Sequence, residues 1–469
     1  MEAHAGLSGI VALPDGHDAF AARALLADAA ERTLDARYYI WHNDMSGSML
    51  FSALRRAADR GVQVRLLLDD NNTAGLDPVL AALDAHPNIE VRLFNPFRVR
   101  RWRLLGYLTD FKRLNRRMHN KSFTADGQAT IIGGRNVGDE YFDAGKGGAP
   151  WFVDLDVLAI GPVVSAVSRD FDRYWASASA TPVARVLPGT TPVSLAAVAA
   201  DAGRVERDPA AAAYVAALAR SPFVGDLLAH RLKFEWSPTQ MVSDDPAKGL
   251  GRAPEESLLW HRLKTSIGRP TRELRLVSPY FVPGSAGVDA LAAIARQGVK
   301  VEVLTNALEA TDVAVVHSGY AKRRKSLLRA GVSLLELKRG SPGSAAKHPK
   351  WTGRSGSGSS ASSLHAKTFC VDRSRVFVGS FNFDPRSARL NTEMGFVIDS
   401  PGLAEAITKW FAEEVPTRAY RVSLGDTGRL RWIDRHDGGE VVQEEEPGTT
   451  VWRRFAVALL SVLPIEWLL

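Results

Sequence analysis

The sequence predicts an α/β fold that is built twice along the chain. Two observations support this prediction. Stretches typical of amphipathic helices alternate with short apolar strands, and a long stretch of the first half reappears in the second half. The chain has 469 residues, enough for two large domains. Its hydrophobic content of 45% and charged content of 24% are ordinary for a globular protein, and they exclude a disordered or fibrous one.

Each half contains the same succession of elements. An apolar strand with aromatic residues near its end comes first, followed by an amphipathic helix, a glycine that ends this helix, and a buried strand. A further helix and strand complete the copy. The first copy spans 36–94 and the second spans 274–337, with Gly61 and Gly298 as the glycine stops. Alternation of this kind indicates α/β units around a buried sheet.

Two polar segments occupy equivalent places in the two copies. HNKSFTADGQATIIGGRN runs from His119 to Asn136, and HAKTFCVDRSRVFVGSFN runs from His365 to Asn382. Both fit the pattern H-x-K-x4-D-x6-G-[GS]-x-N without a gap. A match of this length and order is hard to obtain by chance, so we interpret the repeat as an internal duplication.

The duplication divides the chain into regions. We expect an N-terminal domain with the first motif at 1–178, a helical connector at 179–250, a C-terminal domain with the second motif at 251–420, and a C-terminal extension with an apolar tail at 421–469. A stretch rich in Gly and Ser at 341–363 leads into the second motif. It is expected to form a surface loop or a mobile lid over the site.

The two motifs bring together groups that suit phosphodiester chemistry. A strand places residues i and i+2 on one face, so the histidine and lysine of each motif project side by side. Ammonium and amide groups stabilise charge on phosphate oxygens. One neutral histidine can attack phosphorus and form a phosphohistidine, while the other, protonated, donates to the leaving oxygen. The groups expected to act together are His119, His365, Lys121, Lys367, Asn136 and Asn382.

Each histidine is expected to have a carboxylate that orients it. Asp154 and Glu393 lie at matching places, each eight residues before a proline in equivalent predicted strands. We therefore predict that Asp154 orients His119 and that Glu393 orients His365.

The aspartates of the motifs have a different expected role. Asp126 and Asp372 lie seven residues beyond their histidines along an extended strand, too far to reach them, and are predicted to be structural. We expect no metal ion and no cofactor. The sequence has no H-E-x-x-H motif, and a lysine two residues from each histidine disfavours a bound cation.

The two motifs resemble the signature of the phospholipase D superfamily. Further stretches, among them SDDPAKG at 243–249, GSFNFDPRSARLNTEMGFVI at 379–398 and PIEWLL at 464–469, are similar to the C-type bacterial cardiolipin synthases. The resemblance covers nearly the whole chain. It implies two phospholipase D-like α/β sandwich domains that are related by a pseudo-twofold axis and share one active site.

The resemblance also implies roles for individual residues. His119 would be the nucleophile and His365 the general acid and base. Gly134 and Ser380 hold equivalent positions in the two motifs, so a hydroxyl is available to the phosphate from one half only. The residues implied to bind phosphate are Lys121, Lys367, Asn136, Asn382, Ser380 and Gly134.

The resemblance implies a cardiolipin synthase that joins phosphatidylglycerol to a phosphatidyl group from phosphatidylethanolamine. A second phosphatidylglycerol could be the donor, with the same residues. If water took the place of the alcohol, the enzyme would be a phospholipase D that makes phosphatidic acid, and relatives with the same site cleave DNA. A net charge of +7 is small for a nucleic-acid partner, so we expect phospholipids as partners and no nucleic acid. The oligomeric state stays open.

Two segments are predicted to contact an anionic membrane surface. Residues 97–117 mix eight Lys or Arg side chains with aromatic and aliphatic ones, and residues 455–469 form an apolar tail that either packs on the protein or lies in a bilayer interface. No apolar run is long enough to span a bilayer, and the N-terminus does not look like a signal peptide. We expect a peripheral protein of the bacterial inner (cytoplasmic) membrane. The predicted membrane contacts are Arg100, Arg101, Trp102 and Trp467.

Overall fold

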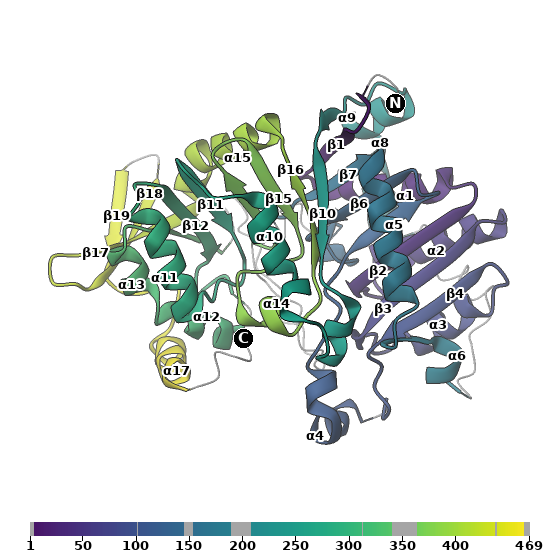
Figure 1. Cartoon of the computed structure of the whole chain (residues 1–469), viewed down its shortest axis with the longest axis horizontal. Helices are drawn as coiled ribbons and strands as arrows, with labels where there is room; N and C mark the ends of the chain where they lie inside the picture. Colours follow the sequence, from purple (N-terminus) through teal and green to yellow (C-terminus); the bar gives the residue numbers. More distant parts are fainter. Residues whose placement is uncertain are drawn as a thin grey trace.

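A computed structural model places the two halves of the chain side by side, each built around one mixed β-sheet (Figure 1). The structure describes residues 4–100, 102–144, 153–188, 208–311, 313–339, 364–436 and 439–463. The Gly- and Ser-rich stretch at 341–363, which is expected to be a loop or a lid, lies outside these residues.

The first sheet has the strand order β8-β4-β3-β2-β5-β6-β7-β1-β9. Its strands are β1 (Ser8–Leu13), β2 (Thr33–Ile40), β3 (Gln63–Asn72), β4 (Ile89–Phe94), β5 (Ser122–Ala125), β6 (Ala129–Gly133), β7 (Asp156–Ile160), β8 (Ala180–Pro182) and β9 (Glu235–Ser237). The helices of this half are α1 (Gly16–Ala29), α2 (Met45–Asp59), α3 (Asp77–Asp84), α4 (Arg103–Leu114), η2 (Asp139–Tyr141), α5 (Pro162–Trp175), α6 (Val183–Val186), α8 (Pro209–Ala219) and α9 (Pro222–Leu228).

The second sheet has the order β10-β16-β15-β14-β11-β12-β13-β17-β18-β19. Its strands are β10 (Thr239–Ser243), β11 (Glu273–Val277), β12 (Lys300–Asn306), β13 (Ser333–Leu337), β14 (Thr368–Val371), β15 (Arg375–Gly379), β16 (Met394–Ile398), β17 (Ala419–Leu424), β18 (Leu430–His436) and β19 (Gly439–Gln443). The helices are η3 (Pro246–Leu250), η4 (Glu255–Ser257), α10 (Leu259–Ile267), α11 (Gly284–Ala295), α12 (Ala314–Ala321), α13 (Arg324–Arg329), α14 (Pro385–Arg389), α15 (Pro401–Glu413), α16 (Val415–Arg418) and α17 (Val451–Val462).

The strand order confirms the duplication. The run β4-β3-β2-β5-β6-β7 in the first sheet matches β13-β12-β11-β14-β15-β16 in the second. In both runs the first three strands are parallel and the last three antiparallel. The predicted glycine stops, Gly61 and Gly298, follow α2 and α11 with positive φ angles of 97° and 83°. This left-handed conformation is easily reached only by glycine, which explains why both copies use it there.

A hydrophobic core joins the two halves. Ile132 of β6 and Val157 of β7 belong to the same buried cluster as Val378 of β15 and Phe396 of β16. Apolar contact between these strands removes their side chains from water. The resulting hydrophobic effect is the main contribution that holds the two surfaces together. The connector changes sheets at Pro238, because β9 pairs with β1 in the first sheet and β10 pairs with β16 in the second. The two halves therefore form one body with the motifs at their junction.

Candidate active site

The histidines of both motifs lie at the junction between the two sheets. His119 comes three residues before β5, and His365 comes three residues before the equivalent strand β14. The backbone N–H of His119 donates to the carbonyl of Thr392 in the second half (2.9 Å), and that of His365 donates to the carbonyl of Val153 in the first half (2.9 Å). Each histidine is therefore fixed by a backbone hydrogen bond to the opposite half.

The orienting carboxylates cross over between the halves. Nδ1 of His119 lies 2.8 Å from Oε2 of Glu393, and Nδ1 of His365 lies 2.6 Å from Oδ2 of Asp154. The predicted pairs, Asp154 with His119 and Glu393 with His365, are therefore wrong: the same four residues form the pairs, but with the partners exchanged. The physical reason is the way the two halves pack. The residue before each carboxylate forms a β-bridge with the residue before the other half's histidine: Thr392 pairs with Met118, and Val153 pairs with Leu364.

Glu393 is held by two hydroxyl groups. The hydroxyl of Ser380 donates to Oε2 of Glu393 (2.5 Å), and that of Ser387 donates to Oε1 (2.8 Å). The expected role of Ser380 as a phosphate ligand is therefore not what the structure shows, because its hydroxyl is already bonded to a buried carboxylate. At the equivalent position, Gly134 leaves room for Asp154: a Cβ atom there would overlap the Asp154 carboxylate. Ser380 and Gly134 therefore both help to position a carboxylate: Ser380 bonds to Glu393, and Gly134 leaves space for Asp154.

The two lysines and two asparagines of the motifs are buried beside the histidines. Nζ of Lys121 donates to the carbonyl of His119 (2.6 Å), and Nζ of Lys367 lies 3.0 Å from Nδ1 of His365. Oδ1 of Asn136 accepts a hydrogen bond from the backbone N–H of Ile40 (3.2 Å). Oδ1 of Asn382 has no hydrogen-bond partner among the residues that the structure describes. This oxygen can accept a hydrogen bond from a bound ligand, whereas a phosphate oxygen would have to be bound by the N–H groups of the same amide.

Burial and positive charge keep both imidazoles neutral. Burial lowers the pKa of His119 well below its usual value, and the ammonium groups of Lys121 and Lys367 lower it further. Burial and the Lys367 ammonium lower the pKa of His365 to about 4, with a contribution from Lys121. The pKa of each histidine is thus lowered in part by the lysine of the opposite half. Such coupling is expected when both motifs contribute to one site.

The two carboxylates differ in charge. Burial raises the pKa of Glu393 to about 7, although Lys121 and the Ser380 hydroxyl oppose this shift. Burial would also raise the pKa of Asp154, but its contact and hydrogen bond with the His365 ring and the positive charge of Lys367 hold it well below its usual range. Asp154 is therefore a full anion at neutral pH, whereas Glu393 is close to half protonated. The two otherwise matching halves of the site are electrostatically unequal.

The motif aspartates lie away from the imidazoles. Asp126 accepts hydrogen bonds from the backbone N–H groups of residues 31–33, and Asp372 accepts them from residues 271–273. Both residues have positive φ angles, 53° and 51°, at the turns that follow β5 and β14. Such contacts fix the start of β2 and β11, as expected of residues with a structural role.

A buried ion pair from the connector supports Glu393, and the sequence reasoning missed it. Oδ2 of Asp244 accepts hydrogen bonds from the backbone N–H of Glu393 (2.9 Å) and from Nζ of Lys248 (2.8 Å). The same Nζ donates to the carbonyl of Ser387 (2.8 Å). Both charged residues belong to the segment SDDPAKG, whose similarity to relatives was the available signal. Its position on the connector gave no indication of this contact.

Two aromatic rings border the histidines and were also missed. The ring of Tyr39 lies 5.0 Å from that of His119, and the ring of Tyr141 lies 5.1 Å from that of His365, both nearly edge-on. Tyr39 ends a predicted strand, which gave only a weak signal. Both tyrosines help to exclude water from the imidazoles.

The residues predicted to contact a membrane have different surroundings. Arg100 turns inward, against the prediction: Nη1 lies 2.5 Å from Oδ1 of Asp70, and Asp77 binds the same guanidinium. The carboxylates of Asp70 and Asp77 attract the Arg100 guanidinium toward the protein. The composition of the segment could not predict these tertiary contacts. Trp102 is 62% exposed. Arg101 and Trp467 lie outside the described residues. No helix in the described part of the chain combines the length and apolar character needed to cross a membrane.

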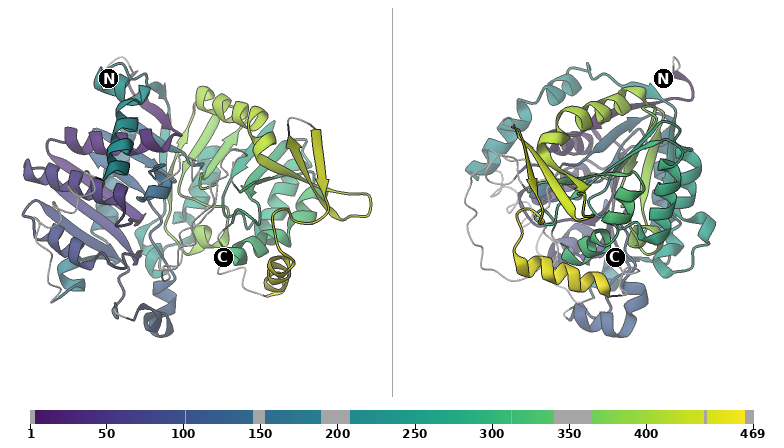
Figure 2. Two further views of the ribbon diagram at one scale, coloured as in Figure 1. Left: turned by 180° about the vertical axis from the view of Figure 1, so that it is seen from behind. Right: turned by 90° about the vertical axis from the view of Figure 1, so that its left-hand side faces the viewer.

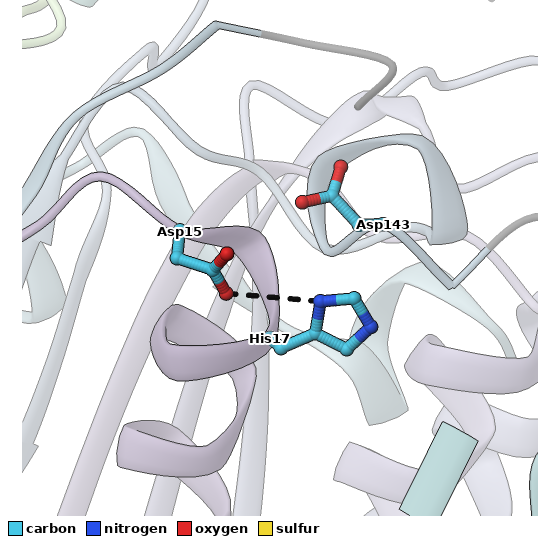
Figure 3. Close-up of side chains that lie close together, drawn as sticks. All are labelled: Asp15, His17 and Asp143. Atoms are coloured by element: carbon cyan, nitrogen blue, oxygen red, sulfur yellow. Dashed lines mark ion pairs between the residues drawn. The ribbon is translucent and has the colours of Figure 1, made fainter. Parts of the chain in front are cut away.

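One further cluster of titratable groups lies apart from the motifs (Figure 3). Asp15 and His17 at the start of α1 form an ion pair of 3.7 Å, and Asp143 lies beside them, close enough for all three to share a cation. Oδ2 of Asp143 instead accepts a hydrogen bond from the backbone N–H of Gly16 (3.2 Å). These contacts account for the cluster as local structure, and we assign it no part in the site.

The fold and the paired motifs define a protein of the phospholipase D-like class. A family model described as "Cardiolipin synthase, PLD-like domain" matches residues 23–175 and again 263–415, so this chain belongs to that family. Cardiolipin synthase C of Escherichia coli (strain K12) is 52% identical over 99% of this chain and 97% of its own length. An uncharacterized protein of Helicobacter pylori (strain ATCC 700392 / 26695) is 30% identical over 97% of this chain and 89% of its own length.

The similarity extends to solved structures. The crystal structure of phosphatidylserine synthase from Haemophilus influenzae Rd KW20 aligns with a TM-score of 0.57 over 88% of this chain and 87% of that one, at 12% sequence identity. At this low identity the likeness concerns the fold alone.

Proposed function

We propose that this protein is a cardiolipin synthase that transfers a phosphatidyl group to the free hydroxyl of phosphatidylglycerol. The observation that carries the proposal is the crossed pair of contacts, His119 with Glu393 and His365 with Asp154, which places two oriented imidazoles in one buried site. Such a site suits double displacement at phosphorus. The relative named cardiolipin synthase C, which is similar over nearly its whole length, supports the substrate class.

In the first step, Nε2 of one histidine attacks the phosphorus of the donor lipid. A P–N bond forms, and the P–O bond to the donor headgroup breaks. The second histidine gives its proton to the departing headgroup oxygen, so that ethanolamine or glycerol leaves as a neutral hydroxyl compound at that oxygen. The bound phosphate adds a negative charge beside both imidazoles, which raises the pKa of the second histidine and lets it hold that proton.

In the second step, the second histidine removes the proton from a hydroxyl of phosphatidylglycerol. The resulting alkoxide attacks phosphorus, the P–N bond breaks, and cardiolipin leaves with both histidines restored to their first states. Each in-line displacement inverts the configuration at phosphorus, so the whole reaction retains it. If water replaces the alcohol, the same steps yield phosphatidic acid.

The difference between the two carboxylates supports His119 as the nucleophile. Asp154 is a full anion, so it can stabilise the imidazolium that forms on His365 when that residue carries the proton. Glu393 is half protonated near neutral pH, so it orients His119 without favouring its protonation as strongly. His119 therefore stays neutral and nucleophilic, and His365 acts as general acid and base.

The transferred phosphate would be held by the two ammonium groups and the two amides. Lys121 and Lys367 come from opposite halves, and the side-chain amide N–H groups of the buried Asn382 can donate to a phosphate oxygen. Asn136 is buried beside them. These groups supply positive charge and hydrogen bonds where the transition state concentrates negative charge. No metal ion or cofactor is needed in this scheme.

The substrates place the enzyme at a membrane surface. We propose that it acts as a peripheral protein on the bacterial inner membrane, with phosphatidylglycerol, phosphatidylethanolamine and cardiolipin as its partners and without a role in nucleic-acid binding. An anionic bilayer surface suits the basic excess of the chain.

The test is to incubate the purified enzyme with phosphatidylglycerol alone and then with added phosphatidylethanolamine, and to identify lipids and released headgroups by mass spectrometry. Cardiolipin with released ethanolamine supports the proposed donor, and cardiolipin with released glycerol identifies phosphatidylglycerol as donor. Phosphatidic acid as the sole product would contradict the transferase proposal. His119→Asn, which keeps a polar group of similar size, is the inactive control.

A further inference from the structure

Large apolar side chains are exposed on two helices that lie far apart in the sequence. In α4 and the residue before it, Trp102, Leu104, Leu105, Leu108 and Phe111 face solvent, and Leu104 and Leu108 are more than 80% exposed. In and beside α17, Val451, Trp452, Phe455, Leu459, Val462 and Leu463 do the same, and Trp452 and Val462 are also more than 80% exposed. Soluble surfaces rarely gather so many large apolar groups, so the concentration indicates a binding surface.

Each helix has one apolar face turned outward and one face fixed to the protein. On α4 the inner side is held by Tyr107, whose hydroxyl donates to Oδ1 of Asn71 (2.8 Å), and by Arg103, which donates to the carbonyl of Asp70 (2.9 Å). On α17 the inner side is held by buried Val457 and by Arg453, which donates to the carbonyl of Thr311 (2.7 Å). The outward residues follow helical spacing along α17 and along α4 as far as Leu108, so they form a ridge on each helix, and Phe111 follows a kink of α4 at Asp110 (φ −142°, ψ 40°).

The two helices lie on the same side of the molecule. In Figure 1 and in both views of Figure 2, α4 and α17 are found at the lower side, and each stands out from the body of its own half. Two separate projecting ridges suit a broad, flat partner better than a compact one, because only an extended surface can contact both at once.

The charges beside the ridges fit an anionic partner. Arg98 and Lys112 are exposed beside and on α4, and Lys325 lines a groove together with residues of α17. The acids beside the helices are paired with arginines: Asp110 with Arg113 (2.7 Å), Glu445 with Arg454 (2.7 Å), and, in the same groove as Lys325, Glu444 with Arg431 (3.3 Å) and Glu446 with Arg324 (2.5 Å). Cations flanking an exposed apolar ridge are typical of helices that lie in the interface of an anionic bilayer.

Both helices are tied to the segments that carry the catalytic histidines. The last residue of α4 lies five positions before His119, and the carbonyl of Asn115 accepts a hydrogen bond from Arg386 of α14 (2.8 Å). Thr311, which is held by α17, follows β12, and the end of that strand bonds to the carbonyl of Leu364 beside His365 (3.2 Å). The segments that support both ridges are therefore connected to the segments that carry the two histidines.

We infer that α4 and α17 form a two-part docking surface for an anionic lipid bilayer, which seats the enzyme with the side that carries α4 and α17 against the membrane. The inference rests on the proposed function, because that function explains why the enzyme would need to bind a bilayer. The binding itself can be tested separately from the activity. It also changes the predicted contacts: the aliphatic and aromatic side chains of both helices insert, while Arg100 stays paired within the protein.

The test measures vesicle binding separately from turnover. Full-length protein is floated with phosphatidylcholine vesicles that contain or lack phosphatidylserine, as wild type and as two variants, Leu104→Gln/Leu108→Gln and Trp452→Gln/Phe455→Gln. Each variant is expected to bind the anionic vesicles about tenfold less than wild type, and the combined variant less still. The matched control, Val215→Gln/Leu228→Gln, removes exposed apolar residues of α8 and α9 on the opposite side of the molecule (Figure 1) and should bind as wild type does.

The outcomes separate this inference from its alternatives. Wild-type protein that fails to float, helix variants that float as well as wild type, or a control that loses binding equally would overturn it. If the helix variants instead converted a lipid-free dimer into monomers, the surface would be a protein interface, which also overturns the inference. Normal flotation without cardiolipin formation would contradict the proposed function and leave the docking surface standing.

Discussion

At the residue scale, the important feature is the exchange of carboxylates between the halves. The sequence predicted the four residues of the two pairs, because duplication places equivalent groups at equivalent positions. It could not predict which carboxylate meets which histidine, since that depends on how two separately encoded sheets pack. His119 with Glu393 and His365 with Asp154 are contacts across the junction. The site therefore exists only when both halves are assembled.

The unequal carboxylates predict different pH dependence for their amide variants. Because the pKa of Glu393 is raised to about 7, the wild-type residue is mostly protonated below that pH and ionised above it. Glu393→Gln resembles the protonated form, so its rate should be within about threefold of wild type near pH 6 and fall about tenfold behind near pH 8. Steady-state kcat measured across this range checks the prediction. A variant-to-wild-type ratio that does not change with pH would contradict it.

Asp154 is expected to behave differently. It is an anion throughout this range, so Asp154→Asn removes a charge that supports the protonated state of His365 and lets the imidazole take the wrong tautomer. We expect kcat to fall by about 10²–10⁴-fold at every pH tested. Circular dichroism melting serves as the folding control. Equal losses for Glu393→Gln and Asp154→Asn at low pH would show that the two halves of the site are not electrostatically distinct.

At the scale of elements, the connector does more than join two domains. Asp244 and Lys248 of the connector form hydrogen bonds with Glu393 and Ser387. In addition, Arg116, which precedes the first motif, donates to the carbonyl of Lys248 (3.2 Å). The interpretation of residues 179–250 as a helical connector placed no functional residue here. The composition of that region is dominated by Ala, Pro, Ser and Thr, which hides a short segment whose role depends on tertiary contacts.

The ion pair of this segment predicts a characteristic pattern of stability. Lys248→Met leaves the fully buried Asp244 carboxylate without its cation, so the free energy of unfolding should fall by about 3–5 kcal/mol. The double variant Asp244→Asn/Lys248→Met removes both charges and should regain more than half of that loss. Denaturant unfolding measures both. The exposed Lys325→Met is the control. A double variant that is as unstable as Lys248→Met, or less stable, would contradict the prediction.

At the scale of the whole molecule, much of the architecture could be predicted because it is encoded twice. Strand–helix alternation, the glycine stops and the matched motifs indicated two equivalent α/β halves, and the common strand order confirms them. The surface was harder to predict. Arg100 and Trp102 look equally suited to a membrane in the sequence, yet only the fold decides that one is paired inside and the other exposed.

The assembled site also predicts independence from metal ions. Burial lowers the pKa of Lys121 well below its usual value and that of Lys367 to about 8, and a bound phosphate, being negative, favours the ammonium form of both, so the two lysines can neutralise the charge that a metal would otherwise neutralise. Cardiolipin formation should therefore stay within about twofold of its original rate after dialysis against a strong chelator. Activity that disappears on chelation and returns with zinc would contradict this account. The same treatment of a metal-dependent phospholipase provides the positive control.

The most direct test of one shared site uses a phosphatidyl donor with p-nitrophenol as leaving group, which departs without needing a proton. His365→Asn lacks the base for the second step, so it should release one equivalent of nitrophenol in a burst and keep one phosphatidyl group on His119, located by peptide mass spectrometry. His119→Asn should show no burst. Two labelled histidines per chain, or a burst from His119→Asn alone, would mean that the imidazoles do not serve one phosphorus atom in these roles.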